Sequence, residues 1–280
     1  MPRAIIVVPC YNEAKRLNVR AIQDFGRRAQ SIELLFVNDG SRDETLALLE
    51  QLQQSNPRRF SFLHLAKNGG KAEAVRQGVL LAIHSGADYV GFWDADLATP
   101  LSEIESFCRV LDARPAVDAV IGTRLPLLGH TIERHPLRYW LGRLFANTAS
   151  LVLGLRIFDT QCGAKLFRVA PHLHALFLHP FAARWIFDVE LFARWQAVRR
   201  ATSLPSLGNA IYEFPLDAWR DVAGSSIKSS DFFKALLEMA KICWTYRRPG
   251  ATAAAARTLA DQPHPPAQIE RPRPDQQQAA

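Results

Sequence analysis

Two carboxylates separated by a single residue, Asp94 and Asp96, are the part of the sequence that points most directly to chemistry. They follow an apolar run, residues 89–93, which is typical of a buried strand in a parallel sheet. Side chains at positions i and i+2 of an extended segment point to the same side, so both carboxylates can face one ligand. Ligands bind at the carboxyl edge of an open α/β sheet, and hard divalent cations prefer oxygen ligands. The pair therefore predicts a Mg²⁺ or Mn²⁺ site that bridges to a diphosphate, with a solvated Asp pair as the alternative for this motif alone.

Two earlier apolar runs also end in polar residues. Residues 4–8 predict a first strand, and the loop after it lacks the Gly-x-Gly-x-x-Gly of a dinucleotide-binding Rossmann unit. Residues 33–37 predict a second strand, which ends in a turn that contains Asp39. The first loop offers groups that could stack on and hydrogen-bond a nucleoside: Pro9, Tyr11, Asn12 and Glu13.

A lysine follows two glycines after a third predicted strand, residues 60–65. The segment Asn68-Gly69-Gly70-Lys71 precedes a helix expected over residues 72–85, where backbone N–H groups and the lysine can meet a phosphate. A flexible turn with a solvated lysine is the alternative. A further strand is expected over residues 117–121, shortly before Arg124. Strands and helices that alternate in this way predict an α/β fold with a doubly wound, mostly parallel sheet.

Three further segments are expected to lie at the start of a helix or strand. Thr99 and Pro100 are expected to begin a helix, because proline is favoured at the first helical position. Residues 159–163 form a polar turn before another strand. Asp188 and Glu190 lie in the first turn of a later helix, where acidic residues favour the macrodipole.

Two amphipathic helices are expected over residues 137–155 and 230–248, each with a tryptophan and basic residues. The first is long enough to span a bilayer, but each central arginine would cost about 2.5–3.5 kcal/mol on an insertion scale. Lying in the membrane interface costs less free energy than spanning the bilayer, and an ordinary core helix is the alternative. The second helix has the basic, tryptophan-bearing pattern of a membrane-surface helix.

The composition is that of an ordinary globular protein with a net charge of +7. Residues 249–280 carry equal numbers of acidic and basic residues and are expected to be disordered, so the excess charge lies in the folded part. A basic surface suits anionic lipid or a phosphorylated substrate, and the lack of an RNA-binding signature disfavours nucleic acid. Neither a signal peptide nor an apolar run of about 18 residues is present, and the cysteines lack disulfide or metal spacing. These features predict a cytoplasmic protein that associates peripherally with the inner face of the membrane.

Taken in order, the motifs resemble the family 2 glycosyltransferases of GT-A fold, and most closely the polyprenyl- and dolichyl-phosphate β-glucosyltransferases. The resemblance covers about residues 4–230, and its motifs are weak singly and specific in this order. Two departures concern Ala164, where the family usually has an aromatic residue, and Lys228, which is displaced from the usual Gly-Ser-Lys. The matching segments are residues 8–13, 37–41, 68–71, 94–96, 122–124, 159–163 and 184–190.

The resemblance implies roles for the polar residues of these motifs. Asp94 and Asp96 would hold Mg²⁺ or Mn²⁺ on the donor diphosphate, and Arg124 would approach the phosphate of a lipid acceptor. Asp159 is a candidate for positioning or proton removal. The nucleotide-binding residues would be Pro9, Tyr11, Asn12, Glu13, Asp39 and Lys71, and the lower-ranked substrate residues Arg138, Gln161, Trp185, Asp188, Glu190 and Lys228.

The function that this resemblance implies is inverting transfer of a hexose, with glucose favoured, from a nucleotide diphosphate sugar to a polyprenyl phosphate at the membrane surface. The alternatives are transfer of mannose, a soluble or protein acceptor, nucleotidyl transfer and non-catalytic nucleotide binding. The expected organisation is a catalytic domain over residues 1–229, a membrane-surface helix over residues 230–248 and a tail. A homo-oligomer is compatible with the sequence.

Overall fold

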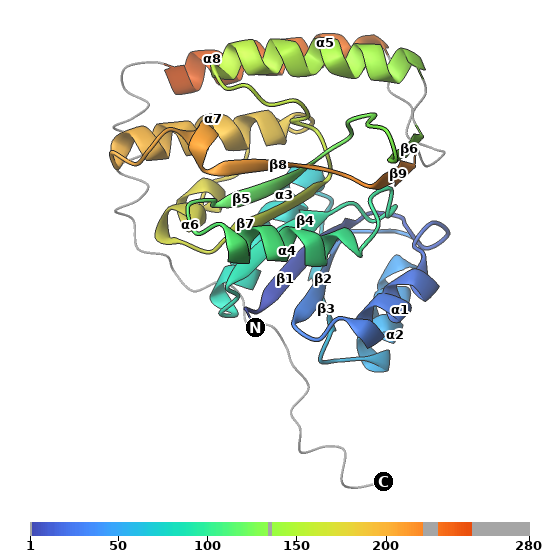
Figure 1. Ribbon diagram of the computed structural model, residues 1–280. Coiled ribbons are helices and arrows are strands. Elements are labelled where there is room, and N and C mark those ends of the chain that lie inside the picture. The colour runs from blue at the N-terminus through green and yellow to red at the C-terminus, as the bar shows by residue number, and fades with distance from the viewer. Residues whose placement is uncertain (1, 134–135, 221–228, 248–280) are drawn as a thin grey trace, which may run out of the picture.

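The computed structural model describes residues 2–133, 136–220 and 229–247. Its centre is a seven-stranded sheet in the order β3-β2-β1-β4-β7-β5-β8 (Figure 1). Strand β7 (Ala164–Arg168) is antiparallel to its neighbours, and the other strands run in one direction, which confirms the predicted mostly parallel sheet. These strands are β1 (Ala4–Cys10), β2 (Ile32–Asp39), β3 (Phe60–Leu65), β4 (Tyr89–Trp93), β5 (Ala119–Thr123) and β8 (Ile211–Pro215).

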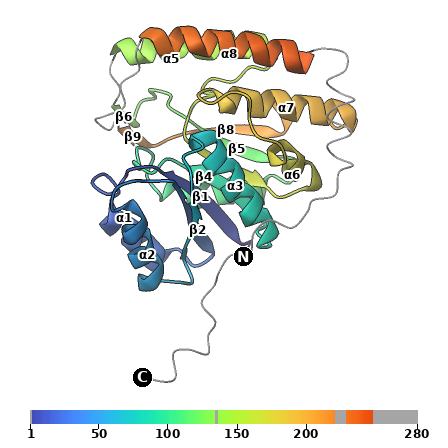
Figure 2. The same cartoon turned by 180° about the vertical axis from the view of Figure 1, so that it is seen from behind.

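Helices cover both faces of the sheet, and successive side chains of a strand face different layers (Figures 1 and 2). In β1, Ile5 and Val7 join one core cluster, whereas Ile6 and Val8 join the other. The strands are buried on both sides, which explains their continuous apolar sequences. The first cluster lies against α3 (Lys71–His84), α6 (Pro171–Phe177) and α7 (Phe187–Ala201), and the second against α1 (Val19–Arg28), α2 (Thr45–Ser55) and α4 (Glu103–Ala113).

Helices α5 (Pro136–Leu153) and α8 (Ser229–Arg247) lie side by side as a further layer outside α7 (Figures 1 and 2). In α8, Ala235, Met239 and Ile242 are buried and belong to the same core cluster as α7. Both helices expected to be amphipathic are therefore present, and each uses one side for packing. Within the described ranges, every helix is too short or too polar to cross a membrane.

The structure corrects one predicted helix start and adds short strands. Helix α4 begins at Glu103, so the prediction that Thr99 and Pro100 begin it is wrong. The indole N–H of Trp93 donates to the Thr99 carbonyl at 2.9 Å and holds this segment outside the helix. A small parallel sheet of β6 (Thr131–Glu133) and β9 (Ala218–Arg220), and the 3₁₀ helix Leu207–Asn209, were not predicted, because these segments are short and have no apolar periodicity.

Candidate functional site

The predicted motifs meet at one edge of the sheet. Strands β1, β2, β4 and β5 are parallel, so the loops that follow them lie at the same edge. Strand β7 runs the opposite way and therefore begins at this edge, directly after the turn of residues 159–163. This arrangement gathers Glu13, Asp39, Asp94, Arg124 and Asp159 at the carboxyl edge of the parallel strands, where ligands bind in an open α/β sheet.

Asp94 forms an ion pair with Lys71, the first residue of α3. A carboxylate oxygen of Asp96 accepts a hydrogen bond from the N–H of Ala98 at 3.1 Å. Burial and the charge of Asp94 raise the pKa of Asp96. Burial lowers the pKa of Lys71, but the charges of Asp94, Asp188 and Asp96 outweigh this effect and raise it. The edge therefore carries a concentration of negative charge, which Lys71 partly offsets.

Gly163 makes room for the Asp94 carboxylate. The N–H of Asp94 donates to the Gly163 carbonyl at 3.1 Å. A Cβ atom at position 163 would lie 1.9 Å from Oδ2 of Asp94, so any other residue there would displace the carboxylate. The turn of residues 159–163 is thus a direct neighbour of the Asp94–Asp96 motif, which its distance in sequence does not reveal.

The loop after β1 is tied to the loop after β2. The N–H of Asn12 donates to Ser41 Oγ at 3.0 Å, and the N–H of Glu13 donates to Thr45 Oγ1 at 2.8 Å. Asn12 adopts a φ of 54°, a left-handed conformation that asparagine tolerates better than most residues. These bonds hold the loop in one shape and leave the Tyr11 side chain exposed beside Pro9.

Glu13 belongs to the same acidic cluster as Asp94 and Asp96. Burial raises the pKa of Glu13, Arg16 opposes the rise, and the charges of Asp96 and Asp94 add to it. Nε of Arg16 lies 3.5 Å from Oε2 of Glu13. The three carboxylates therefore repel one another in this structure, and a bound cation would relieve the repulsion.

Asp39 is buried and binds the glycine loop before α3. Its carboxylate oxygens accept hydrogen bonds from the N–H groups of Gly69 at 2.7 Å and Gly70 at 2.8 Å. Gly70 has a φ of 88°, which explains the glycine at this position. The two N–H groups that were expected to meet a phosphate are therefore occupied by Asp39, and Lys71 is the part of the segment that faces Asp94.

Arg124 and Asp159 form a bidentate ion pair. Nε of Arg124 donates to Oδ2 of Asp159 at 2.6 Å and Nη2 donates to Oδ1 at 2.8 Å. The guanidinium also lies 5.2 Å from the centroid of the Trp219 ring. Gln161 donates its backbone N–H to Asp159 at 3.2 Å, and its side-chain nitrogen is buried without a hydrogen-bond partner in the described part of the chain. The substrate role predicted for Gln161 stays a prediction from the sequence.

Side chains that the sequence did not single out form hydrogen bonds to the backbone of residues 158 and 159. Glu213 of β8 accepts hydrogen bonds from the N–H groups of Phe158 at 2.7 Å and Asp159 at 3.2 Å. Arg143 of α5 donates to the Phe158 carbonyl at 2.9 Å. Asp159 is therefore fixed by both β8 and α5.

Asp188 pairs with a buried lysine, Lys165, which sequence reasoning also missed. Nζ of Lys165 lies 2.7 Å from Oδ1 of Asp188 at the start of α7. The signal for this pair is a charged residue on the same side of β7 as Phe167, where alternation predicts a core position. The structure thus gives Asp188 a partner within the protein.

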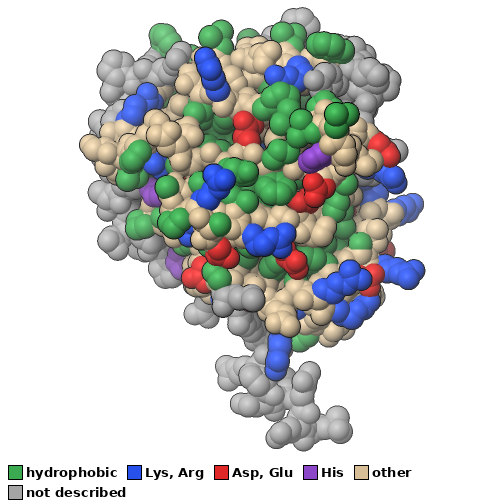
Figure 3. Space-filling view, in the orientation of Figure 1, with side chains coloured by type: hydrophobic (Ala, Val, Ile, Leu, Met, Phe, Trp, Pro, Cys, Tyr) green, Lys and Arg blue, Asp and Glu red, His purple; other side chains and the backbone are tan. Residues whose placement is uncertain are grey.

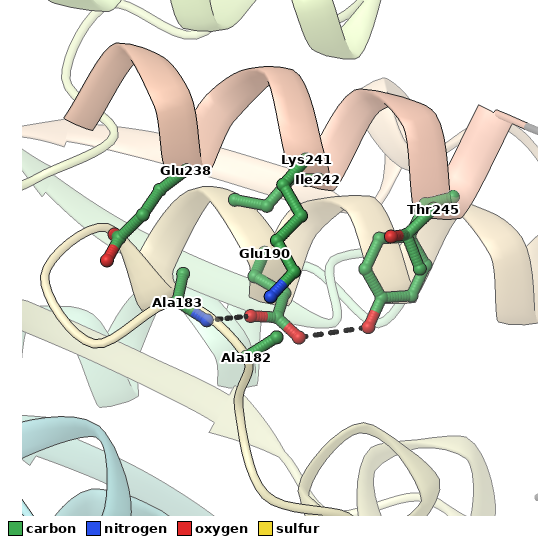
Figure 4. Close-up of a pocket in the computed structure, with 8 residues that line it drawn as sticks. Ala182, Ala183, Glu190, Glu238, Lys241, Ile242 and Thr245 are labelled. Atoms are coloured by element: carbon green, nitrogen blue, oxygen red, sulfur yellow. Dashed lines mark hydrogen bonds between the residues drawn. The ribbon is translucent and has the colours of Figure 1, made fainter. Parts of the chain in front are cut away.

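Glu190 faces a small pocket beneath α8 (Figure 4). Its carboxylate accepts hydrogen bonds from the N–H of Ala183 at 2.7 Å, from Arg194 at 2.7 Å and from the Tyr246 hydroxyl at 2.9 Å. These bonds join α7, α8 and the loop before α7. Glu190 therefore has partners within the protein, and its assignment as a substrate residue stays a prediction from the sequence.

Of the remaining residues predicted from the sequence, the structure describes the side chain of Trp185 but not those of Arg138 and Lys228. Trp185 is 47% exposed in the loop before α7, and the neighbouring Arg184 reaches toward Gly70. Lys228 and the side chain of Arg138 lie outside the described residues. Their assignments stay predictions from the sequence.

The sequence matches the family described as Glycosyl transferase family 2 over residues 5–174. A dolichyl-phosphate beta-glucosyltransferase of Trichomonas vaginalis is 30% identical over 86% of this chain and 71% of its own. The Saccharomyces cerevisiae dolichyl-phosphate beta-glucosyltransferase is 31% identical over 79% of this chain and 68% of its own. A polyprenol monophosphomannose synthase of Mycolicibacterium smegmatis is 26% identical over 85% of this chain and 86% of its own.

Solved structures of GT-A glycosyltransferases share the fold. Glucosyl-3-phosphoglycerate synthase of Mycobacterium tuberculosis superposes with a TM-score of 0.57 at 16% identity, over 87% of this chain and 80% of that one. A mannosyltransferase of Pyrobaculum calidifontis, in complex with GDP-Man and Mn²⁺, gives a TM-score of 0.51 at 17% identity, over 92% and 73% of the two chains. The sheet order and the acidic motif after β4 agree with this fold, and the chain belongs to glycosyl transferase family 2.

Proposed function

We propose that the protein is an inverting hexosyltransferase that moves a hexose, with glucose as the first candidate, from a nucleotide diphosphate sugar to a polyprenyl phosphate. The observation that carries this proposal is the position of the Asp94–Asp96 carboxylates beside the Arg124–Asp159 pair at one sheet edge. The first motif suits a leaving diphosphate and the second an incoming phosphate. The relatives named as dolichyl-phosphate beta-glucosyltransferases support the choice of sugar and acceptor.

The acidic cluster fits a divalent cation. Burial and mutual repulsion raise the pKa of Asp96, and oxygen ligands suit Mg²⁺ or Mn²⁺. No group of three or more His, Cys, Asp or Glu residues in the described ranges is arranged to hold an ion alone. Asp94 and Asp96 would therefore share the ion with oxygens of the donor diphosphate, where it would neutralise the charge of the leaving group. Two GT-A relatives with Mn²⁺ in their structures support this assignment.

The acceptor side is assigned to Arg124. A guanidinium can grip a phosphate through two parallel hydrogen bonds, and Asp159 holds this guanidinium in place. The charge of Asp94 also acts on Arg124, which agrees with a short distance between donor and acceptor subsites. The acceptor phosphate would then meet the sugar near the leaving diphosphate.

The reaction would be a single displacement. An acceptor phosphate oxygen forms a bond to C1 of the sugar while the bond from C1 to the diphosphate oxygen breaks, and the electron pair leaves with the nucleoside diphosphate. Attack on the face opposite the leaving group inverts C1. A phosphate monoester has a second pKa of about 6 and is mostly ionised at neutral pH, so a strong general base is not required. Asp159 is then a positioning residue for Arg124.

The outer layer of α5 and α8 supplies a surface for the lipid bilayer. Trp140, Leu144 and Leu151 of α5 are exposed, as are Leu237 and Trp244 of α8. In the space-filling view, hydrophobic and basic side chains share the upper rim of the molecule, over α5 (Figure 3). Tryptophan and basic side chains are typical of the membrane interface. We assign this layer to the membrane because a polyprenyl phosphate presents its head group there.

A panel of nucleotide sugars tests the proposal. The purified protein is expected to be stabilised against thermal unfolding by one nucleotide sugar in the presence of Mn²⁺ and to transfer its radiolabelled hexose to polyprenyl phosphate. Transfer of mannose from its GDP donor would favour the alternative that the Mycolicibacterium relative suggests. Turnover with water-soluble acceptors alone would exclude the lipid acceptor, and absence of any nucleotide-sugar turnover would exclude a transferase.

A further inference from the structure

Lys165 is a fully buried lysine at the second position of strand β7. Its ammonium group donates to the Cys162 carbonyl at 2.6 Å and lies 2.7 Å from the Asp188 carboxylate. Nζ also lies 5.3 Å from the centroid of the Phe92 ring, on strand β4, which ends directly before Asp94. One ammonium group thus links β7, the turn before it and the first turn of α7.

A buried pair of this kind calls for an explanation other than stability. Removing two charges from water is costly, and buried ion pairs are often no more stabilising than apolar side chains of similar volume. The reaction proposed above assigns no role to Lys165 or to Asp188. The neighbouring core is otherwise built from apolar and aromatic side chains, including Phe167 and Phe187.

The Cys162 carbonyl, which accepts a hydrogen bond from Lys165, is adjacent in sequence to a residue that contacts Asp94. Cys162, whose carbonyl accepts from the ammonium, precedes Gly163. The Gly163 carbonyl accepts the Asp94 N–H, and the Asp94 carboxylate lies in the space that a Cβ atom at position 163 would occupy. A shift of residues 162 and 163 would therefore move the Asp94 carboxylate or its backbone.

We propose that Lys165 is a positioning residue, which fixes the turn of residues 159–163 through Cys162 and Asp188 and thereby sets the place of the Asp94 carboxylate. The inference rests on the proposed function in that Asp94 is taken to bind the metal and diphosphate of the donor. Lys165 itself is sealed from solvent and does not touch a substrate.

The test replaces the pair by apolar residues of similar size, Lys165→Met with Asp188→Leu, so that no unpaired charge is left in the core. The matched control is Arg199→Met with Asp118→Leu, because Arg199 donates to Asp118 at 2.6 Å from the last turn of the same helix. Amide exchange over residues 90–97 is measured in the metal-free protein, and the affinity for Mn²⁺ is measured with saturating UDP or GDP, whichever the wild type binds.

The Lys165 pair variant is expected to stay folded, to exchange the Asp94 amide about tenfold faster and to bind Mn²⁺ about tenfold more weakly, while the control matches the wild type in both measurements. Exchange and Mn²⁺ affinity within twofold of the wild type would overturn the inference. If the double variant does not fold, Asp188→Asn with the same exchange measurement decides: an unchanged Asp94 amide overturns the inference. A wild type that binds no Mn²⁺ with either nucleotide would instead overturn the proposed function. The exchange rate of the Asp94 amide would still test the positioning role of Lys165.

Discussion

The guanidinium of Arg124 lies against the carboxylate of Asp159, with two hydrogen bonds of 2.6 and 2.8 Å. Burial lowers the pKa of Arg124, but the charge of Asp159 and these bonds raise it by more. Asp159 also accepts the backbone N–H of Gln161. Both carboxylate oxygens of Asp159 are thus occupied by donors within the protein, so the pair is better suited to hold a phosphate than to remove a proton.

We expect Arg124→Ala to raise KM for polyprenyl phosphate about tenfold, on the order of 1.4 kcal/mol, with little change for the nucleotide sugar. The reason is that the guanidinium grips an anionic acceptor and has no role toward the sugar. Steady-state kinetics with each substrate varied in turn provide the measurement. Arg124→Lys should restore part of the loss, because the positive charge returns without the bidentate geometry. A loss confined to donor affinity would place Arg124 at the diphosphate and reverse the two subsites.

Asp96→Asn is expected to reduce turnover at least about a hundredfold, roughly 2.7 kcal/mol of activation free energy. The substitution removes one ligand charge from the metal site while it keeps the side-chain volume. Folding should be preserved, because burial and Asp94 already disfavour the charged form of Asp96. Turnover and the thermal unfolding midpoint are measured together. Turnover near that of the wild type would contradict the metal assignment.

The sheet and the site edge could be predicted from the sequence because their signals are local. Apolar runs set β1, β2 and β4, and the polar residues after them lie at the carboxyl edge once the strands are parallel. Gly163 and Asp94 illustrate the limit of this reasoning. Their contact depends on β7 pairing antiparallel with β4, and no local pattern encodes that partner.

Side chains that support the site were the part that the sequence did not reveal. Glu190 and Asp188 both lie in the first turn of α7, and the sequence pattern cannot tell that Glu190 binds Tyr246 and Asp188 binds Lys165. In α8, Leu237 and Trp244 are exposed, which agrees with the pattern of a membrane-surface helix. The side of α8 that packs against α7 consists of Ala235, Met239 and Ile242, which the sequence pattern did not single out.

Acidification is expected to destabilise the fold through His172, at the edge of the sheet opposite the site. Burial lowers the pKa of His172 below its ordinary value of 6.5, while Asp118 raises it and Arg199 lowers it. The ring stacks on Trp195. Because the folded state favours the neutral ring, its stabilising contribution is present above pH 6.5 and is lost as the pH falls through the folded pKa.

The measurement is the thermal unfolding midpoint of the wild type and of His172→Gln from about pH 7.5 to about pH 5. The variant should lose less stability over this range, since its side chain takes up no proton. His179→Gln is the control, because His179 is exposed and should leave the pH dependence unchanged. If the unfolding midpoints of the wild type and of His172→Gln fall equally with pH, other groups govern the loss of stability in acid.

Binding to anionic vesicles tests the outer layer of α5 and α8. Leu237 is 72% exposed and Trp244 is 67% exposed on α8, and Lys234 is exposed on the same helix. Near an anionic surface each basic residue adds about 1 kcal/mol, and salt screens this term. We therefore expect vesicle binding that weakens with ionic strength and weakens further in the double variant Leu237→Ser/Trp244→Ser.

The control for this prediction comes from the other side of the same helix. Met239 and Ile242 are buried against α7, so Met239→Ser/Ile242→Ser should lower the thermal unfolding midpoint, whereas Leu237→Ser/Trp244→Ser should leave it unchanged. Metal-dependent hydrolysis of the donor should survive in the second variant, because it changes the surface and spares the site. Co-sedimentation with vesicles, thermal unfolding and donor hydrolysis are measured on each protein. Unfolding of Leu237→Ser/Trp244→Ser would mean that these side chains are core, and a folded wild type that never binds vesicles would favour a soluble acceptor.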